Sequence, residues 1–249
     1  MTQKSQKTTT PVALITGGAR RIGACIATIL HGAGFNIVIH YRYSKKEANK
    51  LKMQLNKLRD HSAEIIQANL DDSACYDPLI KNAYQLWKRL DVLINNASTF
   101  KTTLLGNTAI TNWDDLCNSN LKAPFFLSQA ACVYLKKTRG IIINITDIHA
   151  EKPMKNYSVY SIAKAGLAML TKSLALELAP FIRVNAIAPG SVLWPEGKNQ
   201  YTENKKMCIL SSTLLKKQIH PTQIAQAALF LIKNTAITGQ TIAIDGGRL

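Results

Sequence analysis

Residues 12–34 read VALITGGARRIGACIATILHGAG, and this stretch decides the fold. VALIT is an apolar, partly β-branched run typical of a buried strand, and IGACIATIL has the apolar spacing of a helix. The glycine turn between them, Thr16 to Gly23, lets an anion approach backbone N–H groups at a helix N-terminus, where the helix dipole also favours negative charge. A plain tight turn would also use Gly17 and Gly18, but its place at the first strand–helix junction favours a phosphate ligand.

Six further runs of the same kind follow along the chain, separated by helical patterns. They are FNIVIHY at 35–41, AEIIQA at 63–68, DVLIN at 91–95, GIIINI at 140–145, IRVNAIA at 182–188 and QTIAID at 240–245. Runs that are apolar on both faces and joined by long crossovers predict a parallel sheet with helices on both faces. The right-handed crossover rule favours a doubly wound α/β sheet of seven strands, a single-domain Rossmann fold, with a ligand crevice where the strand order reverses.

Length and composition fit one such domain. The chain has 249 residues, 47% of them hydrophobic and 18% charged, which suffices for one large core. We expect a polar, disordered tail at residues 1–10 and the domain at 11–249. We also expect a substrate flap at about 191–217, because residues 191–207 form a long irregular stretch. Five cysteines without a C-x-x-C pair, no run of 18 apolar residues and no apolar signal segment predict a cytoplasmic protein that does not enter membranes.

The net charge of +16 is the one unusual value of the composition. It is compatible with a nucleic-acid partner, an anionic ligand or simple solubility. The lysines are spread along the chain without interleaved aromatic residues, so we expect no specific binding of nucleic acid. We expect no metal site, because the five histidines form no H-E-x-x-H motif or carboxylate cluster.

A second stretch, DIHAEKPMKNYSVYSIAK at residues 147–164, carries the chemistry. Tyr160 and Lys164 are four residues apart, so on a helix they share one face, where the ammonium is expected to lower the pKa of the phenol. Asp147 follows the GIIINI run and is expected at the carboxyl end of a strand, where such sheets bind ligands, with its own pKa raised by partial burial. This set predicts proton delivery, whereas a surface tyrosine beside a solvated lysine is the alternative for the Y-x-x-x-K spacing alone.

The end of the second strand, HYRYS at residues 40–44, predicts the cofactor. An acid at this place binds the ribose 2′-hydroxyl of NAD and repels the 2′-phosphate of NADP. No acid occurs before Glu47, while Arg42 and Ser44 offer a guanidinium and a hydroxyl suited to a phosphate dianion. The pattern predicts NADPH, and a solvated basic start to the second helix is the other interpretation.

Together these motifs carry a resemblance to a known family. The glycine turn, NNAS at 95–98, Asn120, YSIAK at 160–164 and TGQTIAIDGG at 238–247 resemble the short-chain dehydrogenase/reductase family over nearly the whole chain. Several departures from its common pattern are similar to the pteridine reductase branch. They are Arg21 in place of the middle glycine, Phe100 after NNAST, Asp147 in place of a serine, and the segments HYRYS and GSVLWPEG.

The resemblance implies roles for individual residues. It implies a catalytic set of Asp147, Tyr160, Lys164 and Asn120, in which the asparagine holds a water that links the lysine to solvent. The implied substrate contacts are Arg21, Ser98, Phe100, Asp147, Tyr160 and Trp194, with Phe100 offering a face for ring stacking. The implied cofactor contacts are Gly17, Arg20, Arg21, Ile22, Gly23, His40, Tyr41, Arg42, Ser44, Asn69, Leu70, Asn96, Ala97, Ser98, Tyr160, Lys164, Pro189, Gly190 and Ser191.

The resemblance therefore implies an NADPH-dependent reductase that transfers a hydride to a dihydropterin or to dihydrofolate. It also implies a homotetramer that packs through long helices at 111–136 and 157–178. Two alternatives stay open. One keeps the fold and reduces a keto or hydroxy compound, against which Asp147 and Phe100 weigh. The other is a non-catalytic, basic binding protein on a Rossmann scaffold, since fold does not fix function.

Overall fold

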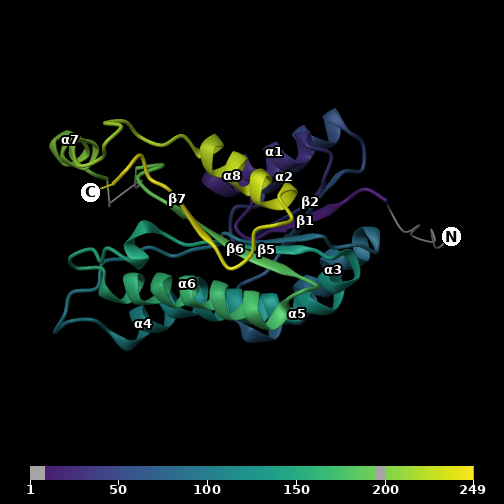
Figure 1. Cartoon of the computed structure of the whole chain (residues 1–249), viewed down its shortest axis with the longest axis horizontal. Helices are drawn as coiled ribbons and strands as arrows, with labels where there is room; N and C mark the ends of the chain where they lie inside the picture. The colour runs from purple at the N-terminus through teal and green to yellow at the C-terminus, as the bar shows by residue number, and fades with distance from the viewer. Residues whose placement is uncertain (1–8, 195–199, 249) are drawn as a thin grey trace.

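The computed structural model describes residues 9–194 and 200–248 (Figure 1). Seven parallel strands form one sheet in the order β3-β2-β1-β4-β5-β6-β7. Their bounds are β1 Val12–Ile15, β2 Asn36–Tyr41, β3 Ala63–Gln67, β4 Val92–Asn95, β5 Ile141–Ile145, β6 Arg183–Pro189 and β7 Thr241–Ile244. The ends of every strand lie within one residue of the predicted run, and the doubly wound sheet is confirmed.

Helices cover both faces of this sheet (Figure 1). One face carries α1 Arg21–Gly32, α2 Lys45–Leu58 and α8 Pro221–Lys233, and the other carries α3 Tyr76–Trp87, α5 Ala123–Thr138 and α6 Ser158–Leu178. Successive residues of a strand point to opposite faces, so Ala13 and Ile15 join one core cluster while Val12 and Leu14 join the other. Burial on both faces is why the central strands are mostly apolar, whereas the edge strands β3 and β7 are only partly buried.

The helix predicted at 111–136 is interrupted, which corrects the sequence analysis. The chain forms α4 at Ile110–Cys117, then a π-helical turn, η2, at Asn118–Lys122, and only then α5. Pro124 lies in the first turn of α5 and has no N–H to donate to the carbonyl four residues earlier, so the regular ladder is broken there. The helix predicted at 157–178 is α6 and begins one residue later.

The predicted flap is helical over part of its length. Its described portion contains α7, Glu203–Ser211, whose N-terminus is capped by Thr202 Oγ1 accepting from the Lys205 N–H at 3.3 Å. The stretch predicted as irregular is therefore only partly so. Residues 1–8 of the expected tail and residues 195–199 of the flap lie outside the described residues.

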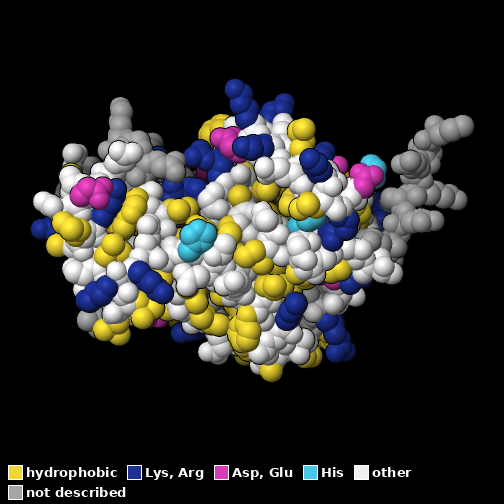
Figure 2. Space-filling view, turned by 90° about the horizontal axis from the view of Figure 1, so that it is seen from above, with side chains coloured by type: hydrophobic (Ala, Val, Ile, Leu, Met, Phe, Trp, Pro, Cys, Tyr) yellow, Lys and Arg dark blue, Asp and Glu magenta, His cyan; other side chains and the backbone are white. Residues whose placement is uncertain are grey.

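Basic side chains form no continuous stripe on the face of the molecule that Figure 2 shows. Figure 2 shows Lys and Arg side chains scattered over one face of the molecule among apolar and uncharged ones. Across residues 9–194 and 200–248 no helix has the length and apolar content that crossing a bilayer requires. Within the same ranges, no three His, Cys, Asp or Glu side chains gather closely enough to hold a metal ion.

Candidate active site

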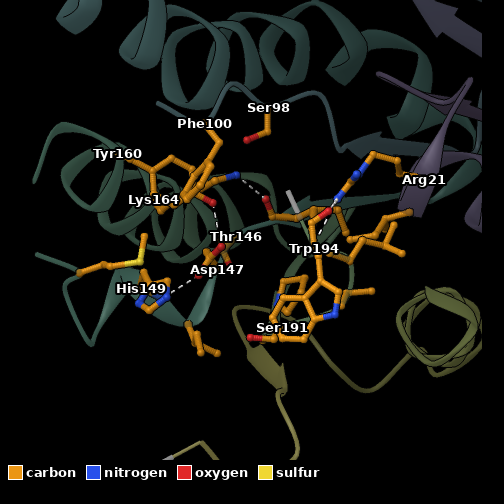
Figure 3. Close-up of a pocket in the computed structure, with 18 of the residues that line it drawn as sticks. Arg21, Ser98, Phe100, Thr146, Asp147, His149, Tyr160, Lys164, Ser191 and Trp194 are labelled. Carbon is orange, nitrogen blue, oxygen red and sulfur yellow. Dashed lines mark hydrogen bonds between the residues drawn. The ribbon is translucent and has the colours of Figure 1, made fainter. Parts of the chain in front are cut away.

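A cavity of about 950 Å³ opens at the carboxyl end of the sheet, where the strand order reverses between β1 and β4 (Figure 3). The loops that follow β1, β4, β5 and β6 form its wall together with the first turns of α6 and part of α7. A second cavity of about 220 Å³ lies at the end of β2. The two share Gly17, Arg20, Ala97 and Ser98 in their walls, so they form adjoining parts of one elongated site.

The glycine turn after β1 leaves no room for a Cβ at Gly18 or Gly23. A Cβ on Gly23 would lie 2.4 Å from the Gly17 carbonyl oxygen and 2.7 Å from Asn96 Nδ2. Gly17 has a φ of +58°, which favours glycine. The side chain of the N-cap residue of α1, Arg20, makes no capping hydrogen bond, and the first turn carries no acid. This end of α1 is therefore built to receive an anion.

Two side chains, the buried His40 and the half-buried Asn96, hold that turn in place. His40 Nδ1 accepts a hydrogen bond from the Gly17 N–H at 3.1 Å, while its Nε2 donates to the Ala68 carbonyl at 3.1 Å. Burial lowers the pKa of His40 to about 4, and the Ala68 carbonyl only partly opposes this, so the ring is neutral. Across the turn, Asn96 Nδ2 donates to the carbonyls of Thr16 and Gly17 at 2.9 and 3.1 Å. Both predicted cofactor residues thus shape the turn.

Arg21 joins the glycine turn to the loop after β6. Its guanidinium donates to the carbonyl oxygens of Leu193 and Trp194 at 3.2 and 3.3 Å (Figure 3). Trp194 lines the main cavity, and its ring lies 6.1 Å from that of Tyr201. The side chain expected to reach substrate and pyrophosphate therefore also holds the start of the flap.

The acid, phenol and amine of the second motif meet inside the main cavity. Tyr160 donates its hydroxyl hydrogen to Asp147 Oδ2 at 2.7 Å, and Asp147 Oδ1 accepts from the His149 N–H at 2.9 Å (Figure 3). Lys164 is buried, donates to the Ile145 carbonyl at 3.0 Å, and its Nζ lies 5.7 Å from the centre of the Tyr160 ring. The strand end and the helix spacing thus deliver the predicted triad.

The titration of the triad differs from the expectation. Burial, and then the charge of Asp147, raise the pKa of Tyr160 well above its ordinary value instead of lowering it. Burial lowers the pKa of Lys164 to about 8, and Asp147 opposes that shift. The helix spacing predicted Lys164 as the nearest charge to the phenol, whereas the closest charged group in the structure is the Asp147 carboxylate, which accepts the hydrogen bond of the phenol. Tyr160 is therefore protonated at neutral pH, and Lys164 is still mostly charged.

Asn120 lies behind the triad in η2. Its Oδ1 accepts from Ser98 Oγ at 2.6 Å, and its Nδ2 donates to the carbonyls of Leu116 and Thr99 at 2.9 and 3.0 Å. The side chain is fully buried and does not line either cavity. It fixes the loop after β4, and through Ser98 it fixes one edge of the cavity.

Aromatic rings form the remaining wall beside the phenol. Phe100 stacks on Tyr157 with ring centres 4.6 Å apart and meets the edge of Tyr160 at 4.9 Å. At most one face of Phe100 is left for a ligand. Sequence reasoning missed Tyr157 and Tyr201. Tyr201 lines the cavity, and burial, Tyr157 and Asp147 raise its pKa. Tyr157 lies three residues before Tyr160, and this helical spacing could have indicated that the two rings lie close together. Nothing in the sequence pointed to Tyr201.

The smaller cavity holds the residues predicted to select the cofactor. Arg42 and Ser44 line it, and Arg42 pairs with Asp71 through an Nη2–Oδ2 distance of 2.7 Å. Arg42 Nε is buried and has no hydrogen-bond partner among the described residues, as a donor awaiting a ligand would be. Leu70 lines this cavity but Asn69 does not; Asn69 Oδ1 accepts from the Asp71 N–H at 3.3 Å. Sequence reasoning missed Asp71.

The structure brings together all but two of the predicted site residues. Asn69 and Asn120 line neither cavity. The smaller cavity takes His40, Tyr41, Arg42, Ser44 and Leu70. The main cavity takes Gly17, Arg20, Arg21, Ile22, Gly23, Asn96, Ala97, Ser98, Phe100, Asp147, Tyr160, Lys164, Pro189, Gly190, Ser191 and Trp194.

Known proteins are similar to this chain over nearly its whole length. Residues 17–248 match a family model described as enoyl-(acyl carrier protein) reductase. The chain is 33% identical to pteridine reductase 1 of Leishmania tarentolae, over 96% of each chain. It is 35% identical to the 3-oxoacyl-[acyl-carrier-protein] reductase FabG of Staphylococcus aureus, over 96% of this chain and 98% of the relative. A 3-oxoacyl-[acyl-carrier-protein] reductase of Synechocystis is 34% identical over 96% and 97%.

Proposed function

Because the chain belongs to the short-chain dehydrogenase/reductase family, we propose that it uses NADPH to reduce dihydropterins to tetrahydropterins. The match over residues 17–248 makes it an oxidoreductase with a nicotinamide cofactor. The phosphorylated cofactor and the pterin are our proposals. One observation carries the pterin: the hydrogen bond of 2.7 Å between Tyr160 and the Asp147 carboxylate inside the cavity.

The residues present fit a dinucleotide. The glycine turn and the uncapped end of α1 suit its pyrophosphate, and the unpartnered Arg42 Nε at the end of β2 suits a 2′-phosphate. When bound, NADPH supplies the hydride. Asp71 pairs with Arg42 in the same cavity, so the preference over NADH is the part of this proposal that a direct comparison must test. Titrating both cofactors against tryptophan fluorescence, with Trp194 in the cavity, makes that comparison.

The residues of the chain supply the proton. When an imine carbon of a dihydropterin gains a hydride, the adjacent ring nitrogen must gain a proton. Tyr160 Oη and Asp147 Oδ2 hold one hydrogen between them, and the raised pKa of Tyr160 keeps it available at neutral pH. Lys164, whose pKa is about 8, places a positive charge near the phenol as that hydrogen leaves. A positioned acid of this kind contributes roughly 10² to 10⁴ in rate.

The rest of the cavity wall supports a flat, polar ring. Phe100 lines the cavity and is the side chain against which such a ring could stack, a contact that contributes on the order of 1 kcal/mol beyond buried area. Ser98 and the backbone of Pro189 and Gly190 provide polar groups around it. A carboxylate can accept hydrogen bonds from the N–H and amino groups of a pterin, which a simple ketone lacks, while the ketone oxygen would need only a hydrogen-bond donor.

A second candidate is the reduction of 3-oxoacyl thioesters. Two of the relatives are named for that activity, and they are 35% and 34% identical to this chain. The pteridine reductase is about as similar, at 33% identity. This reaction delivers a proton to a ketone oxygen, for which the Tyr160 hydroxyl would serve without a carboxylate. Asp147 is the feature that favours the pterin.

One experiment separates the two. NADPH consumption is followed by absorbance with dihydrobiopterin, dihydrofolate and acetoacetyl-coenzyme A as substrates. We expect turnover of the pterins, and we expect Asp147→Ser to lower their kcat by roughly 10² or more while the Kd for NADPH stays within about twofold. Glu151→Ser, which changes an exposed acid outside both cavities, is the matched control. Turnover of the thioester alone, or an Asp147→Ser enzyme with full pterin activity, contradicts the proposal.

We also propose a homotetramer and a cytoplasmic setting. Apolar side chains stay exposed along α5 and α6 of the described chain, among them Phe125, Phe126, Met169 and Leu176, and a second copy would cover them. Light scattering of the purified protein tests the assembly.

A protein that binds NADPH but reduces none of the three substrates, and binds RNA with steep salt dependence, would instead fit the non-catalytic alternative.

A further inference from the structure

Positive side chains dominate the wall of the main cavity. Among the described residues that line it, Asp147 is the only acid, against seven Lys or Arg: Arg20, Arg21, Lys152, Lys155, Lys164, Lys205 and Arg248. Lys164 lies beside Asp147 and offsets its charge, and the two arginines stand at the glycine turn. The four others have no role in the reaction described above. We call Lys152, Lys155, Lys205 and Arg248 the cationic rim.

The cationic rim gathers three separate segments of the chain. Lys152 Nζ donates to the Arg248 carbonyl at 2.6 Å, which ties the loop after β5 to the end of the chain. Arg248 Nη1 donates in turn to the Ile209 carbonyl on α7 at 2.6 Å. On the same helix, Lys205 Nζ lies 3.9 Å from the ring centre of Tyr201, which lines the cavity. The cationic rim is therefore formed by the fold, which brings together residues from three segments of the chain.

No acid of the described residues neutralises this rim. None of its four members takes part in an ion pair there. Glu203, the nearest acid in sequence to Lys205, pairs with Lys206 at 2.7 Å instead. Lys155 and Lys205 are exposed, so their charges face the solvent through which a ligand enters. A cavity mouth lined by one sign of charge concentrates ligands of the opposite sign.

We propose that the cationic rim binds an anionic group carried by the substrate at a distance from its reacting end. This inference rests on the proposed function for the identity of the reacting ring, and it adds the substrate class: a pterin whose side chain ends in carboxylates, as in dihydrofolate, in preference to one with an uncharged side chain. A phosphate on a thioester substrate would present the same chemistry. The experiment distinguishes the two sources.

The test compares Lys155→Gln/Lys205→Gln with the wild type. Substrates are used in two pairs: dihydrofolate and dihydrobiopterin, and acetoacetyl-coenzyme A and the acetoacetyl thioester of N-acetylcysteamine, which has no phosphate. Exposed pairs contribute modestly and are screened by salt, so we expect the variant to lower the ratio of kcat/KM for dihydrofolate to that for dihydrobiopterin by about five- to tenfold at low salt, and less at high salt. Lys57→Gln/Lys81→Gln, which removes the same charge from exposed sites outside both cavities, should leave the ratio unchanged.

The outcomes separate this inference from the proposed function. If only the thioesters react and the variant loses the preference for the phosphate-bearing one, the pterin proposal fails and the cationic rim stands with phosphate as its ligand. If pterins react but the variant keeps the wild-type ratio at low salt, the rim proposal is overturned and the function stands. If nothing is turned over, binding of dihydrofolate to the NADP⁺ complex, read by tryptophan fluorescence, must weaken in the variant, and unchanged binding overturns the inference.

Discussion

The buried amine of Lys164 gives the protein a stability that depends on pH in a defined direction. The side chain is 2% exposed, and burial lowers its pKa from 10.5 to about 8. As the pH rises, the folded state therefore loses this proton before the unfolded state does. Between about pH 8 and 10.5 the unfolded chain binds more protons, so this group makes the folded state more stable as the pH increases.

The size of the effect follows from the two pKa values. Their difference corresponds to about 3 kcal/mol once the pH exceeds both, and about 2 kcal/mol of it should be present at about pH 9.5. Below about pH 7 the two states are both protonated and the contribution is flat. Lys164→Met keeps the length of the side chain and removes the titration, with a constant offset for the lost bond to the Ile145 carbonyl.

Urea unfolding of the apoprotein between about pH 7 and 9.5 measures this contribution. The free energy of unfolding of the wild type, minus that of Lys164→Met, should grow by about 2 kcal/mol over the range. Lys172→Met, on the exposed face of the same helix, should show a difference that does not change with pH. A flat difference for Lys164→Met, or one that falls with pH, would refute the reasoning.

Three other perturbations have clear expected results. Gly23→Ala places a Cβ 2.4 Å from the Gly17 carbonyl oxygen, and the displaced turn should weaken NADPH binding by about 1–3 kcal/mol, measured by fluorescence titration. Thr171→Val removes the acceptor of the buried Asn144 Nδ2, 2.9 Å away, and should lower the free energy of unfolding in urea by about 1–3 kcal/mol without changing the Kd for NADPH. Asp71→Asn removes the negative charge from the smaller cavity and should raise the affinity for NADPH relative to NADH by about three- to fivefold, a ratio of two measured Kd values.

The strands and the triad were readable because local patterns determine them. The strands β1, β4 and β5 are buried along their whole length, so their sequence runs are mostly apolar and their ends could be predicted closely. Asp147 had to lie at the end of β5, and Tyr160 and Lys164 had to share one face of a helix that packs across that end. Their meeting in space follows from those two constraints together.

Features that depend on long-range side-chain contacts were not readable. The pairing of Arg42 with Asp71 joins loops after two different strands, and the sequence alone does not show which acid turns toward the guanidinium. Tyr201 and Arg248 reach the cavity because of how α7 and the end of the chain lie over it. The break at η2 is different, because a local signal for it was present. Pro124 indicates an interruption, but the apolar spacing around it still predicted one continuous helix.

Arg21, whose guanidinium donates to two carbonyls of the loop after β6, belongs to the glycine turn where the dinucleotide is expected to lie. A ligand that draws Arg21 toward the turn must stretch or break its bonds to the Leu193 and Trp194 carbonyls, so the two ends of the site compete for one side chain. Steady-state kinetics should then show a compulsory sequence of addition, with the nucleotide first and the second reactant admitted only afterwards. Arg21 would in this way set the order in which the two reactants bind.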